Sequence, residues 1–564
     1  MSGIYSDFAT SRKVQLPTAS SRMRTNLRIV MWDGTDLVGD LYVPDGAGPW
    51  PVIVQRTPYS AVALKSLGEN YAARGYLFLA VDVRGRYRSG GIWDPAAHEK
   101  SDGPEVLQWA ARLPECNGLV GTRGHSYSAM NQLLAAPQAG PCLRAMVCKS
   151  APADPFDNVP FQGGAYDLND YMWAWQNTGA TSQPDDDSPE ATLRVRQCLS
   201  GRPLIDADVR LGLRNPFIRE WMQHWRRDDY WKARSWLPGL PGTQIPTLHL
   251  SGWWDNSGRG SVLAYHALGG KAGGQRLVLG PWNHQFKAPW LDDLPDHERV
   301  LVAQAAVRDL FVDELAWFDK HLKSEGRELP SAEIFVTGAW RWIEAPDWPP
   351  QEVTVRPWYL TAAGGVSPTA ITRGERQYHF DPARPNPVRS EGFPVELAPY
   401  NTSPDVREDV LVYRSKPLDQ EMLALGDVRV IVRGATTARD IDWVARLVDE
   451  YPDGRSICLR DGILRARFRN GYARPRLPVP NKPADYTVVL WHVGHLFRAG
   501  HRVRVEICSS ALGRWDVNPG DGGDLATSTT LVPSVQTVFH GGLGGTRLFL
   551  SQCPAALAAE LLPD

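Results

Sequence analysis

The stretch Val120-Gly121-Thr122-Arg123-Gly124-His125-Ser126-Tyr127-Ser128-Ala129 decides how this chain folds. Its first half predicts a short strand, its centre predicts a sharp turn at Ser126, and its end predicts a helix that starts near Ala129. A serine on such a strand-to-helix turn holds its hydroxyl above the end of a sheet. The stretch therefore predicts a parallel α/β sheet with an exposed nucleophilic serine, an arrangement called a nucleophile elbow.

The elbow motif needs support from the rest of the chain. Its usual form is Gly-x-Ser-x-Gly, and Ser128 stands where the second glycine is expected. Gly-x-Ser triplets also occur by chance in long chains. A serine hydroxyl becomes a good nucleophile only when a base, usually a histidine oriented by a carboxylate, takes its proton.

Composition limits the classes of function that fit. A chain of 564 residues with 43% hydrophobic and 22% charged residues is expected to hold two or three globular domains. The net charge of −2 offers no basic face for nucleic acid, and no apolar run reaches the ~18 residues that span a membrane. Because the 7 cysteines form no C-x-x-C pair and no signal peptide is visible, we expect a cytoplasmic protein without a metal, a cofactor or a disulfide framework. The sequence leaves open whether the protein forms a homo-oligomer.

The pattern of secondary-structure signals and the composition change three times along the chain. Residues 1–151 alternate strand and helix signals, as an α/β-hydrolase core requires. Residues 152–240 are rich in Trp, Asp, Arg and Pro and predict a helical cap inserted into that core. The α/β pattern resumes over 241–331, with a long helix predicted over 300–322. Residues 332–564, beginning with a strand over 333–337, carry short alternating strands that predict a C-terminal jelly-roll β-sandwich.

Two later segments supply partners for the serine. Asp255 follows the predicted strand 246–252, and His284 follows the predicted strand 276–280. The order Ser126, Asp255, His284 is the order of the catalytic triad in α/β-hydrolases. The carboxyl ends of parallel strands meet at one edge of a sheet, so these three side chains are predicted to meet there.

An acyl-transfer enzyme also needs donors for the oxyanion. One donor is expected to be the backbone N–H of Tyr127, which follows the nucleophile. The other comes from the loop after an early strand, where Tyr59 could offer its phenolic O–H. From the residues alone, Tyr59 fits a half-buried packing position at least as well.

Landmarks spread over most of the chain resemble one family, the CocE/NonD hydrolases. This group of the α/β-hydrolase superfamily includes cocaine esterase, α-amino-acid ester hydrolases, glutaryl acylases and Xaa-Pro dipeptidyl-peptidases. The landmarks are Arg56-Thr57-Pro58-Tyr59, Asp82-Val83-Arg84-Gly85, Gly124-His125-Ser126-Tyr127, Gly252-Trp253-Trp254-Asp255, Gly280-Pro281-Trp282-Asn283-His284, Asp440-Ile441-Asp442 and Ala499-Gly500-His501-Arg502.

The resemblance implies a role for each matching residue. Ser126 is the implied nucleophile, His284 the general base and acid, and Asp255 the group that orients His284. Tyr59 O–H and Tyr127 N–H are the implied oxyanion hole. The chain departs from the family at Ala129, where the family usually has glycine.

The sequence thus predicts a serine acyl hydrolase that cleaves a small-molecule ester or amide through an acyl-enzyme. Two tryptophans of the cap and two beside Asp255 could wall an apolar pocket, or could instead bury the seam between cap and core: Trp173, Trp175, Trp253 and Trp254. One alternative is an Xaa-Pro dipeptidyl-peptidase, which needs an anionic site for the substrate amine. Another is a non-catalytic carbohydrate-binding or scaffold protein.

Overall fold

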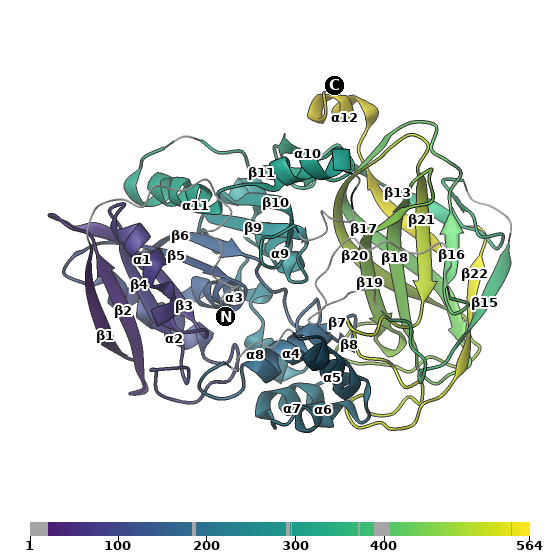
Figure 1. The fold of residues 1–564 in the computed structure, drawn as a ribbon, viewed down its shortest axis with the longest axis horizontal. Coiled ribbons are helices and arrows are strands. Elements are labelled where there is room, and N and C mark those ends of the chain that lie inside the picture. Colours follow the sequence, from purple (N-terminus) through teal and green to yellow (C-terminus); the bar gives the residue numbers. More distant parts are fainter. Residues whose placement is uncertain are drawn as a thin grey trace.

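The chain forms an α/β core, drawn in purple, blue and teal in Figure 1, a blue helical cap inserted into that core, and a green-to-yellow C-terminal β-sandwich. This computed structural model describes residues 21–182, 188–288, 294, 296–326, 328–369, 373–387, 407–542 and 544–563. The cap lies between the other two parts, at the bottom of the view in Figure 1. The predicted α/β core with a C-terminal β domain is confirmed.

Ten strands form the sheet of the core, in the order β1-β2-β4-β3-β5-β6-β9-β10-β11-β12. They are β1 (Arg22–Val30), β2 (Asp36–Val43), β3 (Trp50–Thr57), β4 (Leu77–Asp82), β5 (Cys116–His125), β6 (Leu143–Lys149), β9 (Thr247–Trp254), β10 (Arg276–Asn283), β11 (Ala332–Val336) and β12 (Arg341–Ala345). The strands from β4 to β11 in this order pair in parallel, and β1, β2 and β12 are antiparallel to their neighbours. Every residue of β4 is buried, because helices cover both faces of a parallel sheet.

Helices on the two faces of this sheet bury separate apolar clusters. One face is covered by α2 (Glu99–Ala111), α3 (Tyr127–Ala135) and α9 (Gly258–Ala267). The other face is covered by α1 (Lys65–Ala72) and α11 (Leu310–Phe318). Helix α3, which follows the elbow, therefore packs directly on the strands that carry the predicted site.

The prediction of one long helix over 300–322 is wrong. Helix α10 (Asp296–Ala306) ends within this range at Ala306, and a separate helix, α11, begins at Leu310. The side chain of Asp309 accepts hydrogen bonds from the N–H groups of Phe311 and Val312. Asp309 is thus the N-cap of a second helix, and continuous apolar spacing concealed that break.

The strand predicted over 333–337 exists, but it belongs to the core sheet rather than to the C-terminal domain. β11 pairs in parallel with β10, and β12 pairs with β11. Ile334 and Val336 of β11 pack in one apolar cluster with Leu277 and Leu279 of β10. A strand pattern records that a segment is half-buried, but not which sheet it joins.

The cap and the β-sandwich contain the remaining elements. The cap holds β7 (Phe161–Gln162), β8 (Ala165–Tyr166), α4 (Leu168–Gln176), α5 (Pro189–Ser200), α6 (Ala207–Arg210), α7 (Pro216–Gln223) and α8 (Asp229–Arg234). The larger sheet of the sandwich holds β13 (Thr354–Leu360), β14 (Val366–Ser367), β15 (Gly374–Phe380), β17 (Met422–Thr436), β20 (Ala484–Phe497), β22 (Ser534–His540) and β23 (Arg547–Gln552). The smaller holds β16 (Leu411–Arg414), β18 (Asp442–Glu450), β19 (Ser456–Arg465) and β21 (Arg502–Cys508). A large apolar cluster fills the space between these two sheets.

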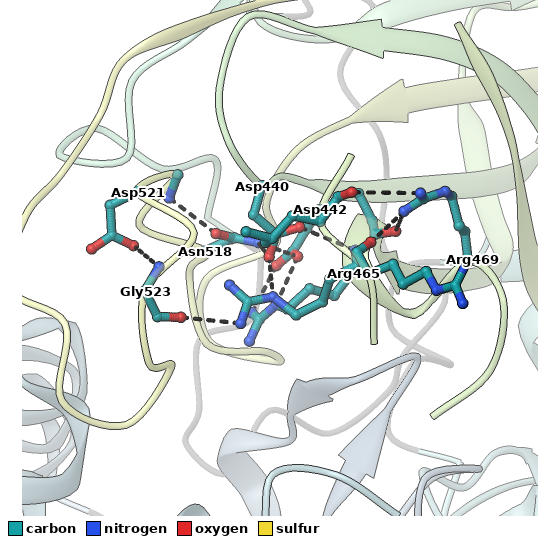
Figure 2. Close-up of polar contacts among 12 residues, drawn as sticks. Asp440, Asp442, Arg465, Arg469, Asn518, Asp521 and Gly523 are labelled. Carbon is teal, nitrogen blue, oxygen red and sulfur yellow. Dashed lines mark hydrogen bonds and ion pairs between the residues drawn. The ribbon is translucent and has the colours of Figure 1, made fainter. Parts of the chain in front are cut away.

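A buried ionic network joins the sandwich to the cap. Figure 2 shows Asp440 and Asp442 pointing toward Arg465 and Asn518. Arg465 binds both oxygens of Asp442, at 2.8 and 2.9 Å, and also binds Asp516 at 3.0 Å. The same oxygen of Asp516, Oδ1, also accepts from the backbone N–H of Tyr166 at 2.7 Å, which connects the network to the cap. Every carboxylate named here has a cationic or amide partner, so this acidic cluster serves as a structural connection.

Two further features are plain from the described part of the chain. None of its helices is long and apolar enough to cross a membrane. All 7 cysteines are free thiols, so no disulfide contributes to the fold.

Candidate active site

The elbow forces the backbone of Ser126 into a conformation that few non-glycine residues adopt. Ser126 has φ 59° and ψ −122°, between the end of β5 and the start of α3 at Tyr127. A Cβ on Gly124 would lie 2.2 Å from the carbonyl oxygen of Ser128, so the helix can turn back onto the strand only above a glycine. The helix begins two residues earlier than predicted, and Ser126 stands at its N-terminus.

The order of the strands fixes where the site lies. β3 is followed in the chain by β4 on one side of it and by β5 on the other side. In open α/β sheets, ligands bind in the crevice outside the carboxyl ends of the two strands at such a switch point. Tyr59 follows β3 and Ser126 follows β5, so both predicted groups border this crevice.

His284 connects the serine to the aspartate. It directly follows β10, and Asp255 directly follows the neighbouring β9. The imidazole Nε2 lies 3.0 Å from Ser126 Oγ, and Nδ1 lies 2.7 Å from Asp255 Oδ1. This geometry lets Nδ1–H donate to the carboxylate while Nε2 accepts the serine proton.

Asp255 is fully buried, yet its surroundings keep it ionised. Burial alone raises the pKa of this carboxyl, but the charge of His284 and the hydrogen bonds from His284 and Ser251 outweigh burial and hold the pKa at about 2. Ser251 Oγ donates to Oδ2 at 2.7 Å, and the backbone N–H of Ser257 donates to Oδ1 at 2.9 Å. The carboxylate is therefore fixed in position and charged at neutral pH.

His125, the residue before the nucleophile, holds His284 in place. Its Nε2–H donates to the backbone carbonyl of His284 at 2.8 Å, and the two rings lie 4.6 Å apart. Burial, followed by the charges of His284 and Lys149, lowers the pKa of His125 far below its usual value. A neutral His125 donates one hydrogen bond without adding a second positive charge beside His284.

Tyr59 is connected to the cap through its phenolic oxygen. The indole Nε1–H of Trp173, on α4, donates to Tyr59 Oη at 2.8 Å. A phenol that accepts a hydrogen bond becomes a better donor of its own proton. Arg86, fully buried, supports the same loop by donating to the carbonyl of Pro58 at 2.9 Å and to the carbonyl of Asn177 in the cap at 3.0 Å.

The side chain of Tyr127 points away from the serine and anchors the start of α3. Its hydroxyl donates to Glu99 Oε1 at 2.8 Å and accepts from the backbone N–H of Ala96 at 3.0 Å. Glu99 in turn pairs with the buried guanidinium of Arg56. The backbone N–H of Tyr127 is the first of α3, and such groups have no carbonyl partner within their own helix.

The four tryptophans predicted for the pocket lie in two places. Trp173 is half-buried beside Tyr59, and Trp175 follows it on the same helix within the apolar cluster of the cap. Trp253 and Trp254 lie in the cluster between core and sandwich, where Trp253 Nε1 donates to the carbonyl of Phe335 at 2.6 Å. The structure thus brings Trp173 to the predicted oxyanion donors and packs Trp253 at the seam with the sandwich.

A buried carboxylate beneath the elbow escaped the sequence reasoning. Glu314 on α11 pairs with Arg123 of β5 at 2.7 Å and with Lys149 of β6 at 3.0 Å. The carbonyl of Lys149 accepts the backbone N–H of Ser126 at 2.9 Å. The pair Asp313-Glu314 in an otherwise apolar helix was the only sequence signal for this support. In the described residues, no group of His, Cys, Asp and Glu is arranged to hold a metal ion.

Comparison with known proteins gives matches along most of the chain. Residues 33–285 match the family model of the X-Pro dipeptidyl-peptidase (S15 family), and residues 325–544 match that of the X-Pro dipeptidyl-peptidase C-terminal non-catalytic domain. The chain is 29% identical to a cocaine esterase from Rhodococcus sp. (strain MB1 Bresler), over 89% of this chain and 93% of that protein.

Two solved structures share the fold. An aminopeptidase from the marine sediment archaeon Thaumarchaeota archaeon superimposes with a TM-score of 0.81 at 23% identity, over 96% of this chain and 98% of that one. A CocE/NonD family hydrolase from Staphylococcus aureus gives a TM-score of 0.70 at 18% identity, over 94% of each chain. At these identities the likeness establishes the three-part architecture.

Proposed function

Because this chain is a serine hydrolase of the CocE/NonD and X-Pro dipeptidyl-peptidase (S15) family, we propose that it cleaves a small-molecule ester or amide through an acyl-enzyme on Ser126. The observation that carries the proposal is the continuous contact from Asp255 through His284 to Ser126, at 2.7 and 3.0 Å. All three groups lie at the carboxyl edge of the core sheet.

In the first half of the reaction, Ser126 Oγ attacks the substrate carbonyl carbon while His284 Nε2 takes the hydroxyl proton. Asp255 stabilises the imidazolium that forms, since its carboxylate accepts Nδ1–H. Tyr59 O–H and Tyr127 N–H donate to the oxyanion of the tetrahedral intermediate. His284 then protonates the leaving alcohol or amine, the bond to it breaks, and the acyl group stays on Ser126.

In the second half, water takes the place of the leaving group. His284 Nε2 removes a proton from the water, whose oxygen attacks the acyl carbon. The second tetrahedral intermediate uses the same two donors. Its collapse returns the proton to Ser126 Oγ and releases a carboxylic acid.

Replacing the nucleophile tests this proposal. Ser126→Ala is expected to abolish hydrolysis of p-nitrophenyl acetate and labelling by an alkyl phosphonate, since no other serine contacts His284 Nε2 in the described structure. The matched control is Ser128→Ala, two residues along α3, whose activity and labelling should stay near the wild-type level. Labelling that persists in Ser126→Ala, mapped by mass spectrometry to another serine, contradicts the assignment.

A second candidate is the release of Xaa-Pro dipeptides, which the description of the matching family model favours. Such a substrate needs an anionic partner for its α-amine. Asp170 lies three residues before Trp173 on α4, so both side chains share one face of that helix. Burial and then the charge of Asp167 raise the pKa of Asp170, and a bound ammonium group would favour its ionised form.

Substrate profiling separates the two candidates. An Xaa-Pro peptidase hydrolyses glycyl-prolyl-p-nitroanilide faster than p-nitrophenyl acetate, and Asp170→Asn raises the KM of the dipeptide substrate only. A small-molecule esterase shows the reverse preference, and Asp170→Asn leaves its ester kinetics unchanged.

A further inference from the structure

A cavity of about 140 Å³ lies at the seam between the core and the β-sandwich. Helix α9 and the end of β9 form one wall, and strands β17, β19 and β20 of the sandwich form the other. None of the five residues assigned to the triad and the oxyanion hole lines it. The cavity is therefore a site separate from the catalytic groups.

The seam itself is closely packed around this cavity. A Cβ on Gly494 of β20 would lie 2.5 Å from the ring of Trp253, so the sandwich approaches the core at a glycine. The backbone N–H of Thr337 donates to the carbonyl of Gly494 at 3.0 Å. Because the core and the sandwich pack closely around it, the cavity has fixed walls.

A buried arginine without a carboxylate partner faces this space. Arg460 of β19 is 9% exposed, and within the described residues its hydrogen bonds all go to backbone carbonyls, those of His492, Trp253 and Leu459. Those bonds use Nε and Nη1, and within the described residues Nη2 has no hydrogen-bond partner and no carboxylate forms an ion pair with this side chain. Burying a cation in this way is costly unless an anion compensates it.

Two other polar side chains of the lining also offer donors. Arg259 Nε is buried without a hydrogen-bond partner in the described structure, while its Nη2 binds Asp157. His492 Nδ1 accepts from Trp348 Nε1 at 2.8 Å, which leaves the proton of the neutral ring on Nε2 as a further donor. Asp427 is the one carboxylate of the lining, and it is already paired with Arg429 at 2.9 Å.

The charge state of the lining is fixed at neutral pH. Burial lowers the pKa of Arg460 to about 10, so its guanidinium remains protonated. Burial, followed by the charges of His266, Arg259 and Arg460, lowers the pKa of His492 to about 3, so that ring is neutral. Burial also lowers the pKa of His266. The cavity therefore holds two cations, one carboxylate and neutral histidines, and carries a net positive charge.

The rest of the lining is apolar and limits the size of an occupant. Val262, Leu263 and the ring of Trp491 contribute to the walls. An apolar protein cavity of about 150 Å³ holds a benzene molecule. The space thus accommodates a single ring or a short aliphatic chain with one charged group directed at Arg460.

We propose that this cavity binds a small organic monocarboxylate, with its carboxylate on Arg460 and its apolar part against Val262 and Trp491. The inference goes beyond the proposed function, because it concerns a site between domains that the hydrolytic mechanism does not use. A carboxylate there contacts both core and sandwich, and its binding stabilises their association.

Calorimetric titration with benzoate tests the proposal, with benzamide as the neutral ligand of the same shape. Wild-type enzyme should bind benzoate at one equivalent and benzamide at least tenfold more weakly, because hydrogen bonds to a charged group are the stronger ones. Arg460→Gln removes the charge, and Val262→Phe fills the cavity while leaving every hydrogen bond of Arg460 in place. Both variants should weaken benzoate binding at least tenfold, and a thermal melt of each verifies that it is folded.

The outcomes also separate this site from the catalytic serine. Benzoate bound near Ser126 is displaced by an active-site phosphonate and is unaffected by Val262→Phe, whereas benzoate in the cavity behaves in the opposite way. Absent binding, equal binding of benzoate and benzamide, or unchanged binding in folded Val262→Phe each overturns the proposal. None of these readouts depends on hydrolysis, so failure of the proposed function is detected independently.

Discussion

Replacing Tyr59 by phenylalanine tests the oxyanion hole with the loss of one oxygen atom. If Tyr59 Oη donates to the oxyanion, Tyr59→Phe removes one of two donors, and the loss of such a donor lowers kcat about 10²- to 10³-fold, or ~3 to 4 kcal/mol of transition-state stabilisation. KM should change little, because the donor acts on charge that develops only in the transition state.

The same substitution has a structural cost that can be estimated separately. Phenylalanine takes the acceptor away from Trp173 Nε1–H, which binds Tyr59 Oη at 2.8 Å. An unsatisfied buried donor costs about 1 to 3 kcal/mol, and the half-buried position of Trp173 places the cost at the lower end. This loss lowers the free energy of unfolding but does not alter kcat of the folded enzyme.

Trp173→Phe is the matched control. It breaks the same hydrogen bond from the other side and keeps the phenol, so kcat should fall less than about tenfold. The assay is steady-state hydrolysis of p-nitrophenyl acetate by the wild type and both variants, with thermal melts alongside. A kcat of Tyr59→Phe within about threefold of wild type, or an equal loss in Trp173→Phe, refutes the donor role of Tyr59.

Two further predictions concern buried carboxylates. Asp255→Asn should lower kcat about 10⁴-fold, because an amide at this position favours the His284 tautomer with its proton on Nε2, facing the serine; a loss under tenfold in stopped-flow acylation argues against the orienting role. Glu314→Gln should lower the free energy of unfolding in urea by about 3 kcal/mol at pH 7, since Arg123 and Lys149 overcome the effect of burial and hold the Glu314 pKa at about 2. That contribution is present above pH ~4.5 and lost as the pH falls toward 2, so wild type and variant should converge in acid; a constant difference down to pH 2 contradicts the assignment.

The chemistry of the candidate site was readable from the sequence because its signals are local. Gly124 and Ser126 specify the elbow through backbone sterics within a few residues. Asp255 and His284 each follow an apolar strand, and adjacent parallel strands end at the same edge of a sheet. Short-range sequence patterns therefore predicted that these distant residues meet, because they identify strands whose ends lie at one edge of the sheet.

The supports of the site were not readable in this way. Glu99 beneath Tyr127, Glu314 beneath the elbow and Arg86 between the Tyr59 loop and the cap are charged residues with no distinguishing spacing. Their partners come from other elements, so each is identified only when those elements are packed. For the same reason, the position of Trp253 beside Asp255 in the sequence does not show that its indole binds the carbonyl of Phe335 at the seam with the sandwich.

The sequence by itself determined the α/β core, the elbow and the order of the three groups that meet at its edge. Tertiary structure alone decided that β11 joins the core sheet, that Trp173 reaches Tyr59, and that Arg460 faces a cavity between two domains. The physical reason is that periodicity and turn chemistry record whether a residue is buried and how the chain bends locally. Which group lies opposite a buried side chain depends on packing between segments far apart in the chain, and no local pattern encodes that choice.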